Sequence, residues 1–192
     1  MLRISFTLLL VLSFQLAAKE SSYESCGLNE KARELARLII THKDQKRPLL
    51  QCNALLAEAA DKKAREMAKE GKVSHDGPGG TPDKRLLNAG YPLSLPVAVI
   101  GNNHVESIMG GTPHAEAVLD YFANSYSHRI HIFGEHPFYM EQFEIGVGHA
   151  EEWYSPHIDY WVVYIAKAER PTIEYDDRDP MKETKYLGVY KK

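Results

Sequence analysis

Histidine is the residue type whose number and placement in this chain most suggest chemistry. Eight of the nine histidines lie between His75 and His157. Neutral imidazole binds divalent metal ions and titrates near neutral pH, so grouped histidines can act as ligands or as acid–base groups. His131 follows His128 by three residues, and on a helix the two share a face, although a surface position is the commoner explanation for His131. The others are interpreted as loop or surface residues: His104, His114, His136, His149 and His157.

The familiar catalytic signatures are missing from the sequence. It contains no His-Glu-x-x-His, Gly-x-Ser-x-Gly or Cys-x-x-Cys motif and no phosphate-binding loop. Gly146 and Gly148 do not continue into a dinucleotide fingerprint, and in a strand they indicate a close approach to a helix. Nothing in these patterns identifies a catalytic residue, and an enzymatic role is left open.

The first 18 residues are typical of a signal peptide, with Arg3 near the start, a short apolar stretch, and Ala17-Ala18 at the end. The apolar stretch is shorter than the roughly 20 residues that a bilayer span requires. We therefore expect a secreted protein, extracellular or periplasmic, with no integral membrane span after cleavage. In an oxidising compartment Cys26 and Cys52 can pair, and their even number favours a disulfide over two separate buried thiols.

The chain behind this leader has the size of one domain. It carries 22 basic and 26 acidic residues, a formal charge of −4. No basic stripe is present, so we expect no nucleic-acid partner. The oligomeric state is not evident from the sequence. We assign residues 28–168 to the folded domain and residues 169–192 to a charged tail.

Apolar spacing predicts two long helices, one from Leu28 to a point before Pro48 and one from Asn53 to Gly71. A short helix is expected from Pro82 to Gly90, with Thr81 as its cap. Another begins at Thr112-Pro113 and runs toward Arg129. Alternating and β-branched residues predict two strands joined by a hairpin loop, residues 144–150 and 160–166. Helices and a hairpin in this order indicate an α+β fold built from layers.

Three segments of this arrangement, in this order, resemble the CAP superfamily (SCP/TAPS), in its bacterial type. The first is the long helix followed by Gly71-Lys72-Val73-Ser74-His75 and a glycine-rich turn. The second is Asn124-Ser125-Tyr126-Ser127-His128-Arg129, and the third is Phe143-Glu144-Ile145-Gly146-Val147-Gly148 with the strand after it. The resemblance covers residues 49–167. It implies a three-layer α-β-α sandwich around a small open cavity.

The resemblance also implies which residues line that cavity. His75 and His128 match the two family histidines, and Glu106 matches the Glu of the Gly-Glu-Asn-Ile motif, here Val105-Glu106-Ser107-Ile108. Val105 and Ser107 depart from that motif. Glu141 and Glu144 are the candidates for a fourth, acidic member. Two imidazoles and a carboxylate suit a divalent ion such as Zn²⁺, although a purely structural hydrogen-bonded cluster uses the same residues.

We therefore expect a secreted binding module whose cavity takes a small or lipidic ligand or a cell-envelope partner. The alternative is an extracellular, metal-assisted hydrolase that uses His75, Glu106 and His128 as ligands or acid–base groups.

Overall fold

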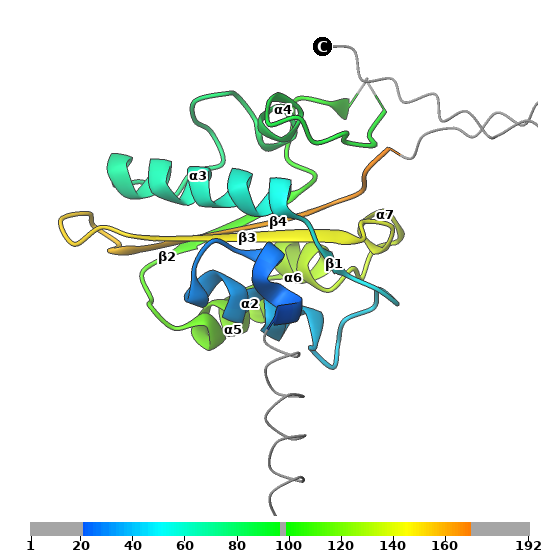
Figure 1. Cartoon of the computed structure of the whole chain (residues 1–192), viewed down its shortest axis with the longest axis horizontal. Coiled ribbons are helices and arrows are strands. Elements are labelled where there is room, and N and C mark those ends of the chain that lie inside the picture. The colour runs from blue at the N-terminus through cyan, green and yellow to red at the C-terminus, as the bar shows by residue number, and fades with distance from the viewer. Residues whose placement is uncertain (1–20, 97–98, 170–192) are drawn as a thin grey trace, which may run out of the picture.

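A four-stranded sheet lies between two helical layers in the computed structural model, which describes residues 21–96 and 99–169 (Figure 1). The predicted signal peptide lies outside the described residues, as does the predicted tail apart from Glu169. One face of the sheet is covered by α3 (Ala54–Glu70) and α4 (Pro82–Asn88), and the other by η1 (Ser21–Cys26), α2 (Glu30–Ile40), α5 (Ala115–Asn124) and α6 (Tyr126–Ile132). The predicted α-β-α sandwich is confirmed.

The sheet has the strand order β1-β3-β4-β2. Its centre is the predicted antiparallel hairpin, β3 (Glu144–Glu151) and β4 (Asp159–Ala166). β2 (Glu106–Gly110) pairs antiparallel with β4, and the short β1 (Gln51–Cys52) pairs parallel with β3. Every residue of β4 is buried because helices cover both faces of the sheet.

The two long helices follow their sequence signals. In α3 the side chain of Asn53 accepts a hydrogen bond from Leu56 N, and Gly71 ends the helix at a φ of 68°, where glycine has no Cβ to oppose the left-handed backbone. α2 is shorter than predicted: Asn29 caps it by accepting from Ala32 N, and the helix ends at Ile40. Leu28, the predicted start, is a largely exposed residue outside the helix.

The smaller helices depart from expectation in two places. The side chain of Thr81 makes no capping hydrogen bond to α4, so it does not act as the predicted cap. The helix predicted from Thr112 toward Arg129 is divided into α5 and α6, because the backbone at Ser125 is extended. This break lets α6 turn so that His128 and His131 lie beside the sheet. A further short helix, α7 (Pro137–Met140), precedes β3.

Helix α3 lies directly on the hairpin strand β3, as the two strand glycines predicted. A Cβ atom at Gly146 would come within 2.2 Å of Ala57 N, and one at Gly148 within 2.2 Å of the Ala60 carbonyl group. Real non-bonded carbon contacts are close to 3.5–4.0 Å. The absence of side chains at both positions therefore sets how closely this helical layer approaches the sheet.

A disulfide joins Cys26 at the end of η1 to Cys52 in β1, as the even cysteine number predicted. Cys26 is fully buried against the core on the α2 face. The bond links the chain just before α2 to the chain just before α3, so it connects the two helical layers across the edge of the sheet.

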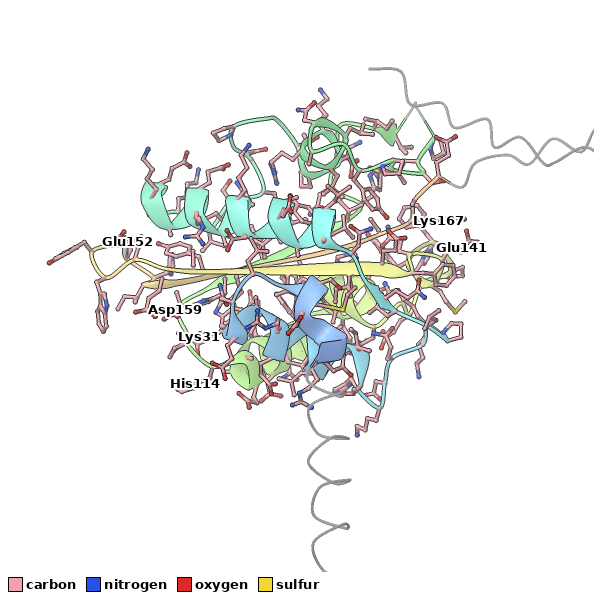
Figure 2. The ribbon with its side chains drawn as sticks, viewed as in Figure 1. Lys31, His114, Glu141, Glu152, Asp159 and Lys167 are labelled. Atoms are coloured by element: carbon pink, nitrogen blue, oxygen red, sulfur yellow. A yellow bond between two sulfur atoms is a disulfide. The ribbon has the colours of Figure 1, made fainter. Side chains whose placement is uncertain are left out.

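Two histidines predicted at the surface are in fact buried. The Nδ1 atom of His131 is hydrogen-bonded to Ser107 Oγ at 2.8 Å. The Nε2 atom of the same ring lies 3.4 Å from the carbonyl oxygen of Ile165. His149 Nε2 lies 2.8 Å from Asp159 Oδ1, which also accepts from Lys31 Nζ (Figure 2). The spacing of residues in the sequence does not predict these partners, because each partner lies on another strand or helix than the histidine it contacts.

None of the helices in the described ranges has the length and apolar character needed to cross a membrane.

Replacing Gly148 by Ala should lower the free energy of unfolding by about 1–3 kcal/mol, because the added methyl group pushes α3 off the sheet. Glu58→Ala, on the exposed side of the same helix, is the matched control and should change stability little. Urea unfolding of both variants measures the difference. Equal stability of Gly148→Ala and wild type would mean that the close approach of α3 is not needed.

The buried histidine also predicts a pH dependence of stability. Burial, with the nearby Arg47, lowers the pKa of His131 from 6.5 to about 3. The unfolded chain therefore binds a proton that the folded protein does not, so stability is full above about pH 6.5 and falls as the pH drops toward 3. Between pH 7 and 4.5 this residue should account for a loss on the order of 2 kcal/mol.

Urea unfolding at both pH values should show a smaller loss in His131→Asn than in wild type. His114→Asn, at an exposed position, should retain the full loss. If the two variants have the same pH dependence, His131 is not held neutral by the fold.

Candidate functional site

A small cavity of about 160 Å³ opens where β2 begins. Its walls come from the loop after α3, the segment leading into β2, α6 and α7. The lining residues are His75, Asn103, His104, Val105, Glu106, Ser107, Ser127, His128, His131 and Tyr139. The structure thus brings the three principal predicted site residues, His75, Glu106 and His128, to one cavity.

The side chain of Glu106 is fully buried in the wall of this cavity and is held there by hydrogen bonds. Its Oε1 lies 2.8 Å from His75 Nδ1, and its Oε2 accepts a 2.7 Å hydrogen bond from Arg85 Nη2. The side chain of Asn103 holds the Glu106 backbone at both ends, accepting from the N–H at 2.9 Å and donating to the carbonyl at 3.0 Å. Both carboxylate oxygens are therefore engaged by protein groups.

Arg85, on α4, is a site residue that the sequence analysis missed. Besides Glu106, it donates to the carbonyl oxygen of His75 at 2.8 Å and to the hydroxyl of Tyr164 at 3.2 Å. A buried carboxylate needs a positive partner, and this requirement is the only signal in the sequence that could have pointed to an arginine nearby. Several basic residues satisfy it equally well, so only the fold identifies Arg85.

The loop that carries His75 is held in place at the next residue, Asp76. Lys63, almost completely buried in α3, donates from Nζ to the carbonyl oxygen of Asp76 at 2.8 Å and pairs with Glu66 at 2.6 Å. With the bond from Arg85, this fixes two successive backbone carbonyl groups, those of His75 and Asp76. The His75 side chain is 42% exposed. Its Nε2 has no protein partner among the described residues.

His128 lies on the opposite wall. Its Nδ1 is 2.8 Å from Ser125 Oγ, and its ring packs against Tyr121 and Phe122 at centroid distances of 5.6 and 5.0 Å. Burial lowers the pKa of His128, and the neighbouring His75 lowers it further. The imidazole is accordingly neutral at pH 7. Like that of His75, its Nε2 makes no hydrogen bond within the described part of the chain.

Ser107 and His131 form a hydrogen-bonded pair in the same lining. Ser107 stands where the resemblance implies an asparagine, and the structure shows that its hydroxyl meets His131 Nδ1. Arg47, itself buried, donates to the carbonyl oxygens of His131 and Ile132 and so caps the end of α6. The shared helix face of His128 and His131 was the sequence signal that could have placed both in the cavity.

Neither candidate for a fourth acidic member reaches this cavity. Glu141 is exposed and accepts a 2.8 Å hydrogen bond from Lys167 Nζ (Figure 2). Glu144 accepts from Asn53 Nδ2 at 2.9 Å and from the hydroxyl of Tyr91 at 2.8 Å, and thus ties β3 to the start of α3. Arg129, next to His128, donates to Glu135 at 3.0 Å.

The predicted three-ligand metal set of His75, Glu106 and His128 does not fit this geometry. Both oxygens of Glu106 are already bound to Arg85 and His75. In residues 21–96 and 99–169, no three His, Cys, Asp or Glu side chains are grouped so that they could hold one metal ion. Without Glu106, the predicted set keeps His75 and His128, which fall short of the three protein ligands usual in catalytic zinc sites.

Comparison of the structure with solved proteins gives two matches. An outer surface protein from Borrelia burgdorferi aligns at a TM-score of 0.52 and 19% identity, over 71% of this chain and 88% of that one. An extracellular protein containing an SCP domain from Bacillus anthracis aligns at 0.53 and 22% identity, over 70% of this chain and 40% of that one. The chain therefore spans less than half of the second protein.

Sequence comparison adds nothing to these two matches. No family model matches the chain, and no curated protein matches it. The likeness is therefore one of fold. The chain has the fold of the SCP domain, the CAP superfamily fold that the three sequence segments resemble.

Proposed function

We propose that the protein is an extracellular binding module that takes a small polar ligand in the cavity at the start of β2. The observation that carries this proposal is a pair of imidazoles, His75 and His128, that line one small cavity. Among the described residues, neither Nε2 atom has a hydrogen-bond partner. Polar atoms left free in a partly enclosed site are the groups that fix a ligand's orientation.

An extracellular location is supported by three independent features. The sequence begins with a segment typical of a signal peptide. The two cysteines are joined, as is usual for proteins of oxidising compartments. The two structural matches are described as an outer surface protein and an extracellular protein.

The size and lining of the cavity favour a polar group over an acyl chain. Its volume of about 160 Å³ is below the roughly 300–1,000 Å³ typical of sites for drug-sized ligands. Histidine, asparagine, serine and tyrosine side chains dominate the lining. An acyl chain placed here would leave the Nε2 atoms of His75 and His128 without water or a partner, at a cost of about 1–3 kcal/mol for each one buried.

The alternative, a metal-assisted hydrolase, depends on an ion held by His75, Glu106 and His128. The engagement of Glu106 by Arg85 stands against it, because a carboxylate that left Arg85 to bind a metal would leave a largely buried guanidinium without its counter-charge. We therefore place Glu106 as the partner that orients His75, and we assign it no role as a metal ligand.

The binding proposal is tested by ¹⁵N NMR of the histidine side chains during addition of acetate, glycerol, methyl glucoside and, separately, palmitate. At least one polar compound should shift the signals of His75 and His128 together. His75→Ala and His128→Ala should each weaken that binding about tenfold, the effect of one lost hydrogen bond of about 1.4 kcal/mol. His114→Ala, at an exposed position, is the control and should bind normally. A response to palmitate alone, or to none of the compounds, would contradict the proposal.

Titration with Zn²⁺ by calorimetry separates the two functions. We expect no stoichiometric site of micromolar or tighter affinity, because the described residues hold no group of three His, Cys, Asp or Glu side chains placed for one ion. One bound ion per chain, lost in both His75→Ala and His128→Ala, would instead support the metal-assisted alternative.

A further inference from the structure

Two partly exposed aromatic rings lie beside the residues that line the cavity. Tyr121, on α5, is 48% exposed and lies 5.6 Å from the ring of His128. Phe138, on α7, is 37% exposed and lies 5.8 Å from His104 and 5.0 Å from Tyr139, both of which line the cavity. Each ring thus contacts a residue of the lining directly.

The polar groups between these rings carry almost no net charge. The charge of Glu106 is matched by Arg85, and burial holds His128 neutral by lowering its pKa. Burial also raises the pKa of Tyr139, which keeps its hydroxyl protonated. The neutral imidazole, together with the hydroxyl groups carried by Ser127 and Tyr139, includes atoms that donate and atoms that accept hydrogen bonds.

This combination matches the chemistry of a sugar. A sugar ring has hydroxyl groups that both donate and accept hydrogen bonds, and its C–H faces pack on aromatic rings. An anion would find no uncompensated positive charge in the lining. The volume of about 160 Å³ leaves room for a single ring or a small end group, so a longer ligand must continue across the mouth.

We infer that the cavity and its two flanking rings form a binding surface for a neutral glycan. One sugar unit enters between His75 and His128, and the adjoining units pack on Tyr121 and Phe138. This inference rests on the proposed function, since it names the ligand class of the same cavity. It adds that affinity rises with glycan length, because only units beyond the first reach the rings.

The test uses two neutral series, N-acetylglucosamine and its β-1,4 oligomers, and glucose and its α-1,4 oligomers, each from one to four units. Isothermal calorimetry on the wild-type chain should show affinity that increases with length in at least one series. Tyr121→Ala and Phe138→Ala should each weaken binding of the longest oligomer about 2–10-fold, the range of one aromatic contact. Both should leave binding of the single sugar nearly unchanged.

Tyr126→Ala supplies the matched control. Tyr126 is 72% exposed and directly precedes the cavity residue Ser127, but its ring packs under Arg129. This variant should bind oligomers as wild type does. Thermal unfolding should show that all three variants are folded.

The outcomes separate this inference from the proposed function. If neither series binds while another polar compound binds at His75 and His128, the glycan inference is overturned and the binding module stands. Affinity that does not rise with length, or that is unaffected by Tyr121→Ala and Phe138→Ala, also overturns it. If the wild-type chain binds none of the polar compounds and neither glycan series, both the glycan inference and the proposed function are overturned.

Discussion

The buried carboxylate of Glu106 is bound on one side by Arg85 and on the other by His75. These three residues come from the start of β2, from α4 and from the loop after α3, so one ionic cluster joins three segments at the edge of the sheet. A buried charge is costly unless it is paired and hydrogen-bonded. Each partner is therefore required to stay in place, and the free nitrogen of His75 is presented to the cavity as a consequence.

The opposite wall of the cavity is fixed by different forces. α6 is held by Arg47, which binds the carbonyl oxygens at its end, and by the hydrogen bond between His131 and Ser107 in β2. Underneath, the glycines of β3 let α3 approach the sheet closely. The cavity thus lies between a wall organised by the ion pair of Glu106 and Arg85 and a wall organised by hydrogen bonds of Arg47, His131 and Ser107.

The chain has the SCP-domain architecture, and it differs from the resembled motif at Val105 and Ser107. Val105 packs into the core on the α3 side. Ser107 provides the hydroxyl that binds His131, so this change accompanies a buried histidine on the facing helix. The departures are therefore integrated into the packing around the cavity. They alter which polar groups line it while His75 and Glu106 keep their contact.

The sequence by itself determined the local features. Caps and glycines fixed the ends of α3, alternation fixed the β3–β4 hairpin, and the resemblance brought His75, Glu106 and His128 into one site. Only the tertiary structure decided the roles of Arg85, His131 and Glu141. Helix ends and strands are set by neighbours a few residues apart, which a sequence displays. Burial and ion pairing depend on residues far apart in the chain, and several arginines, histidines and glutamates fit the same pattern until the layers stack.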